Sequence, residues 1–287
     1  MNVIQRFLSG YSNWWFSPLP RSRVAWFKTI VYSFVFLDVL VLRPWVADNG
    51  MVSELLYRPL MIGRSLPLPV PTPLVVTVVK FALLAFAALA LSGRLPRLAG
   101  IAVFLLYSEW MLIAFSYGKV DHDRFAFLVA LAVLPTVGKT HWRDHSVDES
   151  SGWALHCVQA AVVATYFLAT FAKFRFGGID WVDGATLTRA VLRRGTFFAD
   201  PLQDHWQILH VGQYLIVLFE LGSPLMLMRN MIGRLYVWGA FFFHAVTFAA
   251  ITILFWPHVV CLLSFLKLER LGSVRVTRRL KPVGAER

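Results

Sequence analysis

The sequence predicts an all-α fold, a polytopic transmembrane helical bundle of about eight spans. Of its 287 residues, 57% are hydrophobic and 15% are charged, whereas soluble domains average roughly 45–50% and about 25%. Eight apolar blocks recur along the chain, and a bilayer-spanning helix needs about 20 residues. An ordinary soluble enzyme is therefore excluded, and the spans leave no room for a separate soluble domain.

Residues 1–23 are predicted to form an amphipathic helix that lies in the membrane interface and stays attached. The segment lacks the short apolar core and the small-residue cleavage site of a signal peptide. Apolar and aromatic side chains recur along it at helical spacing, which is typical of an interfacial helix. This stripe consists of Ile4, Phe7, Leu8, Tyr11, Trp14 and Trp15.

Residues 24–268 are predicted to form the transmembrane bundle, with one helix for each apolar block. The fourth and eighth blocks are short, so either flanking residues complete them or the last two blocks form a tight hairpin near Phe255, Trp256 and Pro257. In chain order the blocks are Val24–Leu42, Leu74–Ser92, Leu98–Tyr117, Phe125–Val137, Trp153–Lys173, His210–Met228, Leu235–Ile251 and Ile253–Leu266.

Two connections between blocks are long, and we expect both to be structured and on the outer side. Residues 43–73 contain a series of prolines, which favours extended or turn backbone. Residues 174–209 contain apolar side chains opposite arginines at helical spacing, which predicts a short amphipathic helix. Its apolar side is formed by Leu187, Ala190 and Val191, and its basic side by Arg189, Arg193 and Arg194.

The distribution of charge predicts a cell-membrane protein with both termini in the cytoplasm. With that orientation, sixteen Lys and Arg residues lie inside and nine outside, as the positive-inside rule requires. Residues 269–287 then form a basic cytoplasmic tail, while Arg189, Arg193 and Arg194 run against the rule. The net charge of +12 does not indicate nucleic-acid binding, because the basic residues lie between apolar blocks and form no dense patch.

Ionisable residues inside the predicted spans are the first candidates for function, because each costs about 2.5–3.5 kcal/mol at a helix centre without a partner. Lys28 and Lys80 are interpreted as side chains that bend toward an interface. Lys173 lies at the outer end of the fifth span, and two interpretations remain open: its side chain bends toward the interface, or it has a functional role. The acidic residues Asp38, Glu109 and Glu220 are interpreted as structural partners of basic or donor groups.

Lys173, His122 and His244 are all predicted to lie in the outer half of the membrane. If they share a cavity, apolar walls and a neighbouring cation favour the uncharged lysine, the form that acts as a base. The alternative is that each histidine is a satisfied structural residue. His258, His156, His205 and His210 have no comparable neighbours in sequence, and no metal site is predicted for His141 and His145.

Four ordered motifs resemble those of the HTTM family, which includes the vitamin K-dependent γ-glutamyl carboxylases. The resemblance covers roughly residues 20–268. The core motif corresponds to residues 166–174 (YFLATFAKF) and the following Trp181-Val182-Asp183-Gly184. The shorter motifs correspond to Tyr57-Arg58-Pro59-Leu60, Asp121-His122-Asp123-Arg124 and Phe243-His244.

The resemblance implies an enzyme that uses a reduced quinone, such as menaquinone or vitamin K, in an outer-leaflet pocket. Lys173 is implied as the base, with His122 and His244 as hydrogen-bonding or charge-stabilising groups. An apolar pocket suits such chemistry because it excludes water, which would quench a strong base. Cofactor contacts are implied for Arg58, Asp121, Tyr166 and Trp181.

The sequence also departs from the family pattern. Asp121 replaces an expected asparagine, and Ala172 stands where the carboxylase has a second lysine. We expect no carboxylation of clotting-type proteins, because the chain ends at Arg287 without the large region that selects them.

Three functional hypotheses therefore stand beside one another. The first is a quinol-dependent lyase or oxidoreductase that acts on a peptide or membrane partner at the outer surface. The second is a non-catalytic membrane factor for the maturation or control of a secreted peptide, and the third is a small transporter or lipid-binding protein. All three imply contact with membrane lipid.

Overall fold

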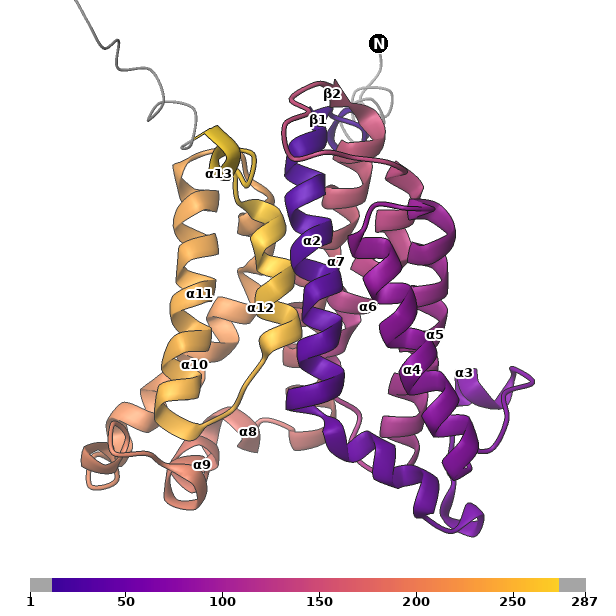
Figure 1. The fold of residues 1–287 in the computed structure, drawn as a ribbon. Coiled ribbons are helices and arrows are strands. Elements are labelled where there is room, and N and C mark those ends of the chain that lie inside the picture. The colour runs from indigo at the N-terminus through magenta and orange to yellow at the C-terminus, as the bar shows by residue number, and fades with distance from the viewer. Residues whose placement is uncertain (1–11, 274–287) are drawn as a thin grey trace, which may run out of the picture. The chain divides into compact units, whose positions relative to one another are not determined.

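A computed structural model describes residues 12–273, and these residues form an all-α fold (Figure 1). The chain divides into two units. The described parts of unit 1 fall within Met1–Asp121, Leu128–Cys157 and Leu266–Arg287, and unit 2 comprises His122–Phe127 and Val158–Phe265. The helix α7 contributes to both units, since the boundary falls after Cys157.

The α-helices are α2 (Arg21–Leu37), α3 (Met61–Arg64), α4 (Pro73–Leu91), α5 (Pro96–Ser116), α6 (Phe125–Val133), α7 (Glu149–Gly177), α8 (Asp180–Asp183), α9 (Thr186–Arg194), α10 (Trp206–Leu221), α11 (Met231–Ile251), α12 (Trp256–Leu262) and α13 (Arg270–Ser273). A π-helical turn, Asp38–Leu42, continues α2. Short 3-10 helices cover Pro44–Met51, Glu54–Leu56, His122–Arg124, Leu134–Val137, Asp200–Leu202, Ser223–Leu227 and Leu263–Phe265.

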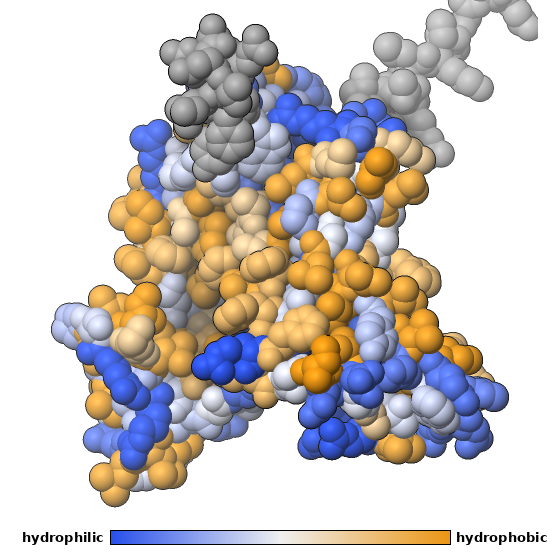
Figure 2. All heavy atoms as spheres, turned by 180° about the vertical axis from the view of Figure 1, so that it is seen from behind, coloured by the Kyte–Doolittle hydropathy of each residue, from blue (hydrophilic) through white to orange (hydrophobic). Residues whose placement is uncertain are grey.

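Five of the helical segments in residues 12–273 are long and apolar enough to cross a membrane, so the chain is a helical membrane protein. They are Arg21–Leu42, Pro73–Leu91, Pro96–Ser116, Glu149–Gly177 and Met231–Ile251. The other three predicted blocks coincide with shorter helices: α6, α10, and the apolar segment Trp256–Phe265. Hydrophobic residues cover much of the face shown in Figure 2, where lipid can contact them.

Residues 1–11 of the predicted interfacial helix lie outside the described residues, residues 12–15 are helical, and the last part has a different structure. Leu19–Pro20 form the strand β1, which pairs antiparallel with β2 (Val147–Asp148). The first long helix then begins at Arg21 rather than at the predicted Val24. The physical reason is that Pro18 and Pro20 cannot continue a helix, whereas the residue after Pro20 can begin one.

The core of unit 1 is built by α2, α4 and α5, which lie side by side in Figure 1. Thr72 caps α4, since its side chain accepts a hydrogen bond from Val75 N, and Pro73 occupies the first turn. Gly100 on α5 permits a close approach, because a Cβ there would lie 2.7 Å from Pro135 Cγ and 2.7 Å from the Tyr32 hydroxyl.

The buried charges of unit 1 follow the predictions only in part. Asp38 is fully buried and accepts a hydrogen bond of 2.7 Å from the Tyr107 hydroxyl, as expected of a structural partner. Both carboxylate oxygens of Glu109, by contrast, are buried without a hydrogen-bond partner among residues 12–273. Lys28 turns its ammonium toward the carbonyl oxygen of Gly138, 2.6 Å away.

The two long connections are structured, but one differs from its prediction. Residues 43–73 contain three short helical segments rather than mainly extended backbone, because prolines such as Pro44 are tolerated in the first turn of a helix. The amphipathic helix predicted in 174–209 is confirmed as α9. Its Val191 packs with Ala199, Leu209 and Ile251 in a core of unit 2.

Candidate functional site

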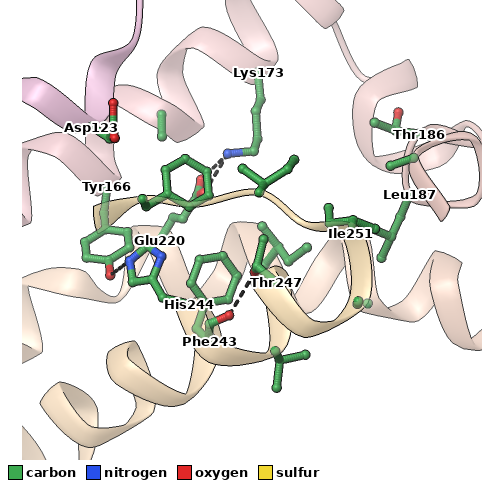
Figure 3. A pocket seen from close by; sticks show the side chains of 18 of the residues that line it. Asp123, Tyr166, Lys173, Thr186, Leu187, Glu220, Phe243, His244, Thr247 and Ile251 are labelled. Carbon is green, nitrogen blue, oxygen red and sulfur yellow. Dashed lines mark hydrogen bonds and ion pairs between the residues drawn. The ribbon is translucent and has the colours of Figure 1, made fainter. Parts of the chain in front are cut away.

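Unit 2 contains a cavity of about 440 Å³ whose walls are mainly apolar. This volume lies within the range of small-molecule sites, roughly 300–1,000 Å³. The helices α7, α9, α10, α11 and α12 contribute lining residues, together with the 3-10 helix at His122–Arg124. We refer to it as the unit 2 pocket, and Figure 3 shows it from close by.

An ion pair lies in this pocket between α7 and α10. Lys173 Nζ is 2.6 Å from Glu220 Oε1 and 2.7 Å from Oε2, and the Thr170 hydroxyl donates to Oε2 at 2.7 Å. The side chains of Lys173 and Glu220 are 17% and 6% exposed. Trp181, on α8, places its ring centroid 5.0 Å from the ammonium, which is within range of a cation–π contact.

A second polar group is formed by Tyr166, His244 and His258. The Tyr166 hydroxyl and His244 Nε2 are joined by a hydrogen bond of 2.7 Å, marked in Figure 3. The His258 ring centroid lies 4.7 Å from that of Tyr166 and 5.3 Å from that of His244. Both ring nitrogens of His258 and Nδ1 of His244 are buried without hydrogen-bond partners among residues 12–273.

Helical periodicity explains why these groups meet. Tyr166, Thr170 and Lys173 are separated by four and three residues, so they share one face of α7. Glu220 and His244 reach the same cavity from α10 and α11, which pack through Phe219. The Phe219 ring stacks on Tyr236 at 5.0 Å and on Phe243 at 5.3 Å.

The structure brings together five of the seven predicted site residues in this pocket: His122, Tyr166, Lys173, Trp181 and His244. Arg58 and Asp121 are not among its lining residues, and both belong to unit 1. Arg58 donates hydrogen bonds to the carbonyl oxygens of Leu55 and Tyr57. Asp121 forms an ion pair with Arg43.

Two lining residues were undervalued from sequence. Glu220 was interpreted as a structural partner of a basic or donor group, and it pairs with Lys173 and Thr170. Its place in the pocket was not predicted, although a lysine in a membrane span requires an acid or an exit to water. His258 was expected to lack neighbours, and this expectation is wrong because it contacts Tyr166 and His244. No spacing rule connects α7, α11 and α12, so the sequence offered no signal for His258.

The arrangement suits a lipophilic ligand with a small polar head. The walls are apolar, while the ion pair and the imidazoles can donate and accept hydrogen bonds. Within residues 12–273 no group of three or more His, Cys, Asp or Glu residues could hold a metal ion. Fold and site together define a helical membrane protein with a pocket inside unit 2.

Comparison with known proteins adds no relative: no family model, no curated protein and no solved structure matches the chain.

We expect His258→Leu to raise the melting temperature. An imidazole with two unpartnered nitrogens costs stability, on the order of 1–3 kcal/mol, and leucine fills a similar volume with apolar atoms. Thermal unfolding in detergent, followed by intrinsic fluorescence, measures the change. His156→Leu is the control, because His156 is also buried but its Nδ1 is 3.1 Å from the Trp15 carbonyl oxygen. Equal destabilisation by both changes would contradict the prediction.

Proposed function

We propose that the unit 2 pocket binds a reduced quinone and that the protein is a quinol-dependent membrane enzyme. The observation that carries the proposal is the Lys173–Glu220 ion pair in an otherwise largely apolar cavity. Such a pair is costly to bury for structure alone. It supplies a positive charge and a proton acceptor next to the space where a ligand would lie.

The lining residues fit the chemistry of a quinol. Its apolar part matches side chains such as Leu187, Leu209 and Ile251, and its oxygens match the unpartnered nitrogens of His244 and His258. A bound quinol would supply two electrons and two protons, and molecular oxygen is the oxidant that would accept them. In this proposal Glu220 takes the proton of the Lys173 ammonium, and the neutral amine then acts as the base.

The resemblance to the HTTM family agrees with this assignment, because Lys173, His122 and His244 stand at the positions of its motifs. We further propose the eight-span topology with both termini cytoplasmic, which places the pocket in the outer half of the cell membrane. The substrate is then a peptide or membrane protein that approaches from outside. Arg58 and Asp121 have no role at the pocket in this proposal.

A second candidate is a non-catalytic membrane factor that binds a ligand or peptide in the same pocket. One observation favours it: the Lys173 ammonium donates hydrogen bonds to both carboxylate oxygens of Glu220, so each charge already has its partner. In that case Lys173 is needed as a cation and not as a base.

Lys173→Arg separates the two candidates, because arginine keeps the charge but cannot lose its proton. We expect the wild-type protein in nanodiscs to consume oxygen above the autoxidation blank when supplied with a reduced menaquinone. Lys173→Arg should lower this rate by at least about 100-fold, the lower range for loss of a general base. Lys80→Arg, on α4 and outside the pocket, is the matched control. Equal rates for Lys173→Arg and wild type would reject the base.

A further inference from the structure

A second cavity, of about 220 Å³, lies in unit 1 between α2, the end of α4 and residues 138–142. We refer to it as the unit 1 cavity. The charged side chains that line it are Lys28 and Lys139, and no Asp or Glu is among its lining residues. A cavity with cations and no acid in its wall is suited to an anion.

Two buried groups in this cavity have unused hydrogen-bonding capacity. Lys28 is 8% exposed, and its ammonium donates one bond, of 2.6 Å, to Gly138 O. An ammonium has three protons, so two remain for another acceptor. Tyr32 lies one turn further along α2, is 2% exposed, and its hydroxyl has no hydrogen-bond partner among residues 12–273.

The nearby acids balance the positive charge of the unit 1 cavity only in part, because Asp144 and Asp148 together exceed Arg21 by one negative charge, whereas Lys28, Lys139 and Arg97 are three cations. Asp144 and Asp148 both pair with Arg21, at 3.0 and 2.5 Å. A hydrogen bond from Ser146 and the Arg21 guanidinium keep the pKa of Asp144 below its usual value. Arg97 adds further positive charge, since a Cβ on Gly138 would lie 3.5 Å from its Nε.

The position of the cavity along the helices indicates a ligand at the membrane surface. It lies where α4 ends at Leu91 and near the beginning of α2, and its walls include Ala25 and Ala90. Trp142 lines it and donates a hydrogen bond of 3.1 Å to Thr29. Tryptophan and basic residues at the ends of apolar helices are typical of headgroup depth.

We propose that the unit 1 cavity binds the phosphate group of an anionic phospholipid. Lys28, Lys139 and the Tyr32 hydroxyl are the donors, and the acyl chains extend along the apolar helices. Basic pockets between transmembrane helices bind lipid headgroups in this way. The proposal is independent of quinol chemistry, because the cavity shares no residue with the unit 2 pocket.

Native mass spectrometry of the full chain in detergent tests the proposal, with phosphatidylglycerol as the probe and phosphatidylcholine as the neutral comparison. We expect wild type to bind phosphatidylglycerol more tightly than phosphatidylcholine. Lys28→Met should weaken phosphatidylglycerol binding about fivefold, since one lysine near an anionic headgroup contributes about a factor of five. Lys28→Arg should keep most of the affinity, and Lys80→Met is the matched control on α4.

Competition with inorganic phosphate distinguishes a phospholipid headgroup from free phosphate as the ligand of the unit 1 cavity. Failure of millimolar phosphate to displace phosphatidylglycerol supports a lipid, whereas displacement supports phosphate recognition but overturns the lipid as the ligand. Equal affinity of wild type for both lipids would overturn the whole proposal. If Lys28→Met does not fold, Lys139→Met replaces it, because that exposed side chain leaves the Lys28–Gly138 hydrogen bond intact. An unchanged affinity in Lys139→Met would then overturn it.

Discussion

Lys173→Met should destabilise the protein by about 3–5 kcal/mol, the cost of leaving a buried charge without its partner. Glu220 is 6% exposed at its side chain and has one remaining donor, the Thr170 hydroxyl at 2.7 Å. Because its side chain is short and deeply placed, it cannot reach water as a lysine can. Unfolding by SDS titration in bicelles at neutral pH measures the loss.

The double variant Lys173→Met/Glu220→Leu should recover most of this stability. Removing both charges eliminates the unpaired carboxylate, and apolar replacements of buried ion pairs are often neutral or stabilising. A double-mutant cycle gives the interaction energy, and Lys80→Met controls for loss of a lysine elsewhere. Losses that simply add in the double variant would show that the pair does not interact in the folded protein.

This double variant also separates folding from function. A folded protein without the pair should show no quinol-dependent oxygen uptake if the proposed function holds. Uptake equal to that of wild type would mean that the pair only stabilises unit 2. Comparing the double variant with wild type is informative because the structural and the chemical hypothesis both depend on Lys173 and Glu220.

The helical fold was predictable because hydropathy is local. Each apolar block coincides with a helix, and α9 was predicted from the positions of Leu187, Ala190 and Val191. The ends of the helices were harder to predict from sequence, because a proline can end a helix or begin one. Pro44 and Pro73 both stand in the first turn of a helical segment, which residue type alone does not decide.

The pocket was predictable only in part, since contacts between helices are not encoded by spacing. Lys173, Tyr166 and Trp181 lie near one another in sequence, and the structure also places them near one another in space. Glu220 reaches the pocket because α10 packs against α11 through Phe219, and His258 reaches it because α12 packs against α11. The motif containing Arg58 resembles the family locally, but this residue is held by its own loop.

Gly100→Val should destabilise unit 1 by at least about 1–3 kcal/mol through overpacking. A Cβ at this position would lie 2.7 Å from Pro135 Cγ and 2.7 Å from the Tyr32 hydroxyl. Tyr32 can shift, but the proline ring is rigid, so α5 must move away from residues 134–137. Small residues at such helix interfaces allow close backbone approach in membranes.

Gly239→Val is the matched control, since Gly239 is also within a long membrane helix, α11, and a Cβ there meets only Phe219 Cε2 at 3.6 Å. Its substitution should change the free energy of unfolding little, because that distance is an ordinary van der Waals contact. Both variants are compared by SDS titration in bicelles. Equal losses would attribute the effect to valine in a helix rather than to the contact with Pro135. Gly100→Val should also weaken phosphatidylglycerol binding, because the new side chain would displace Tyr32, which lines the unit 1 cavity.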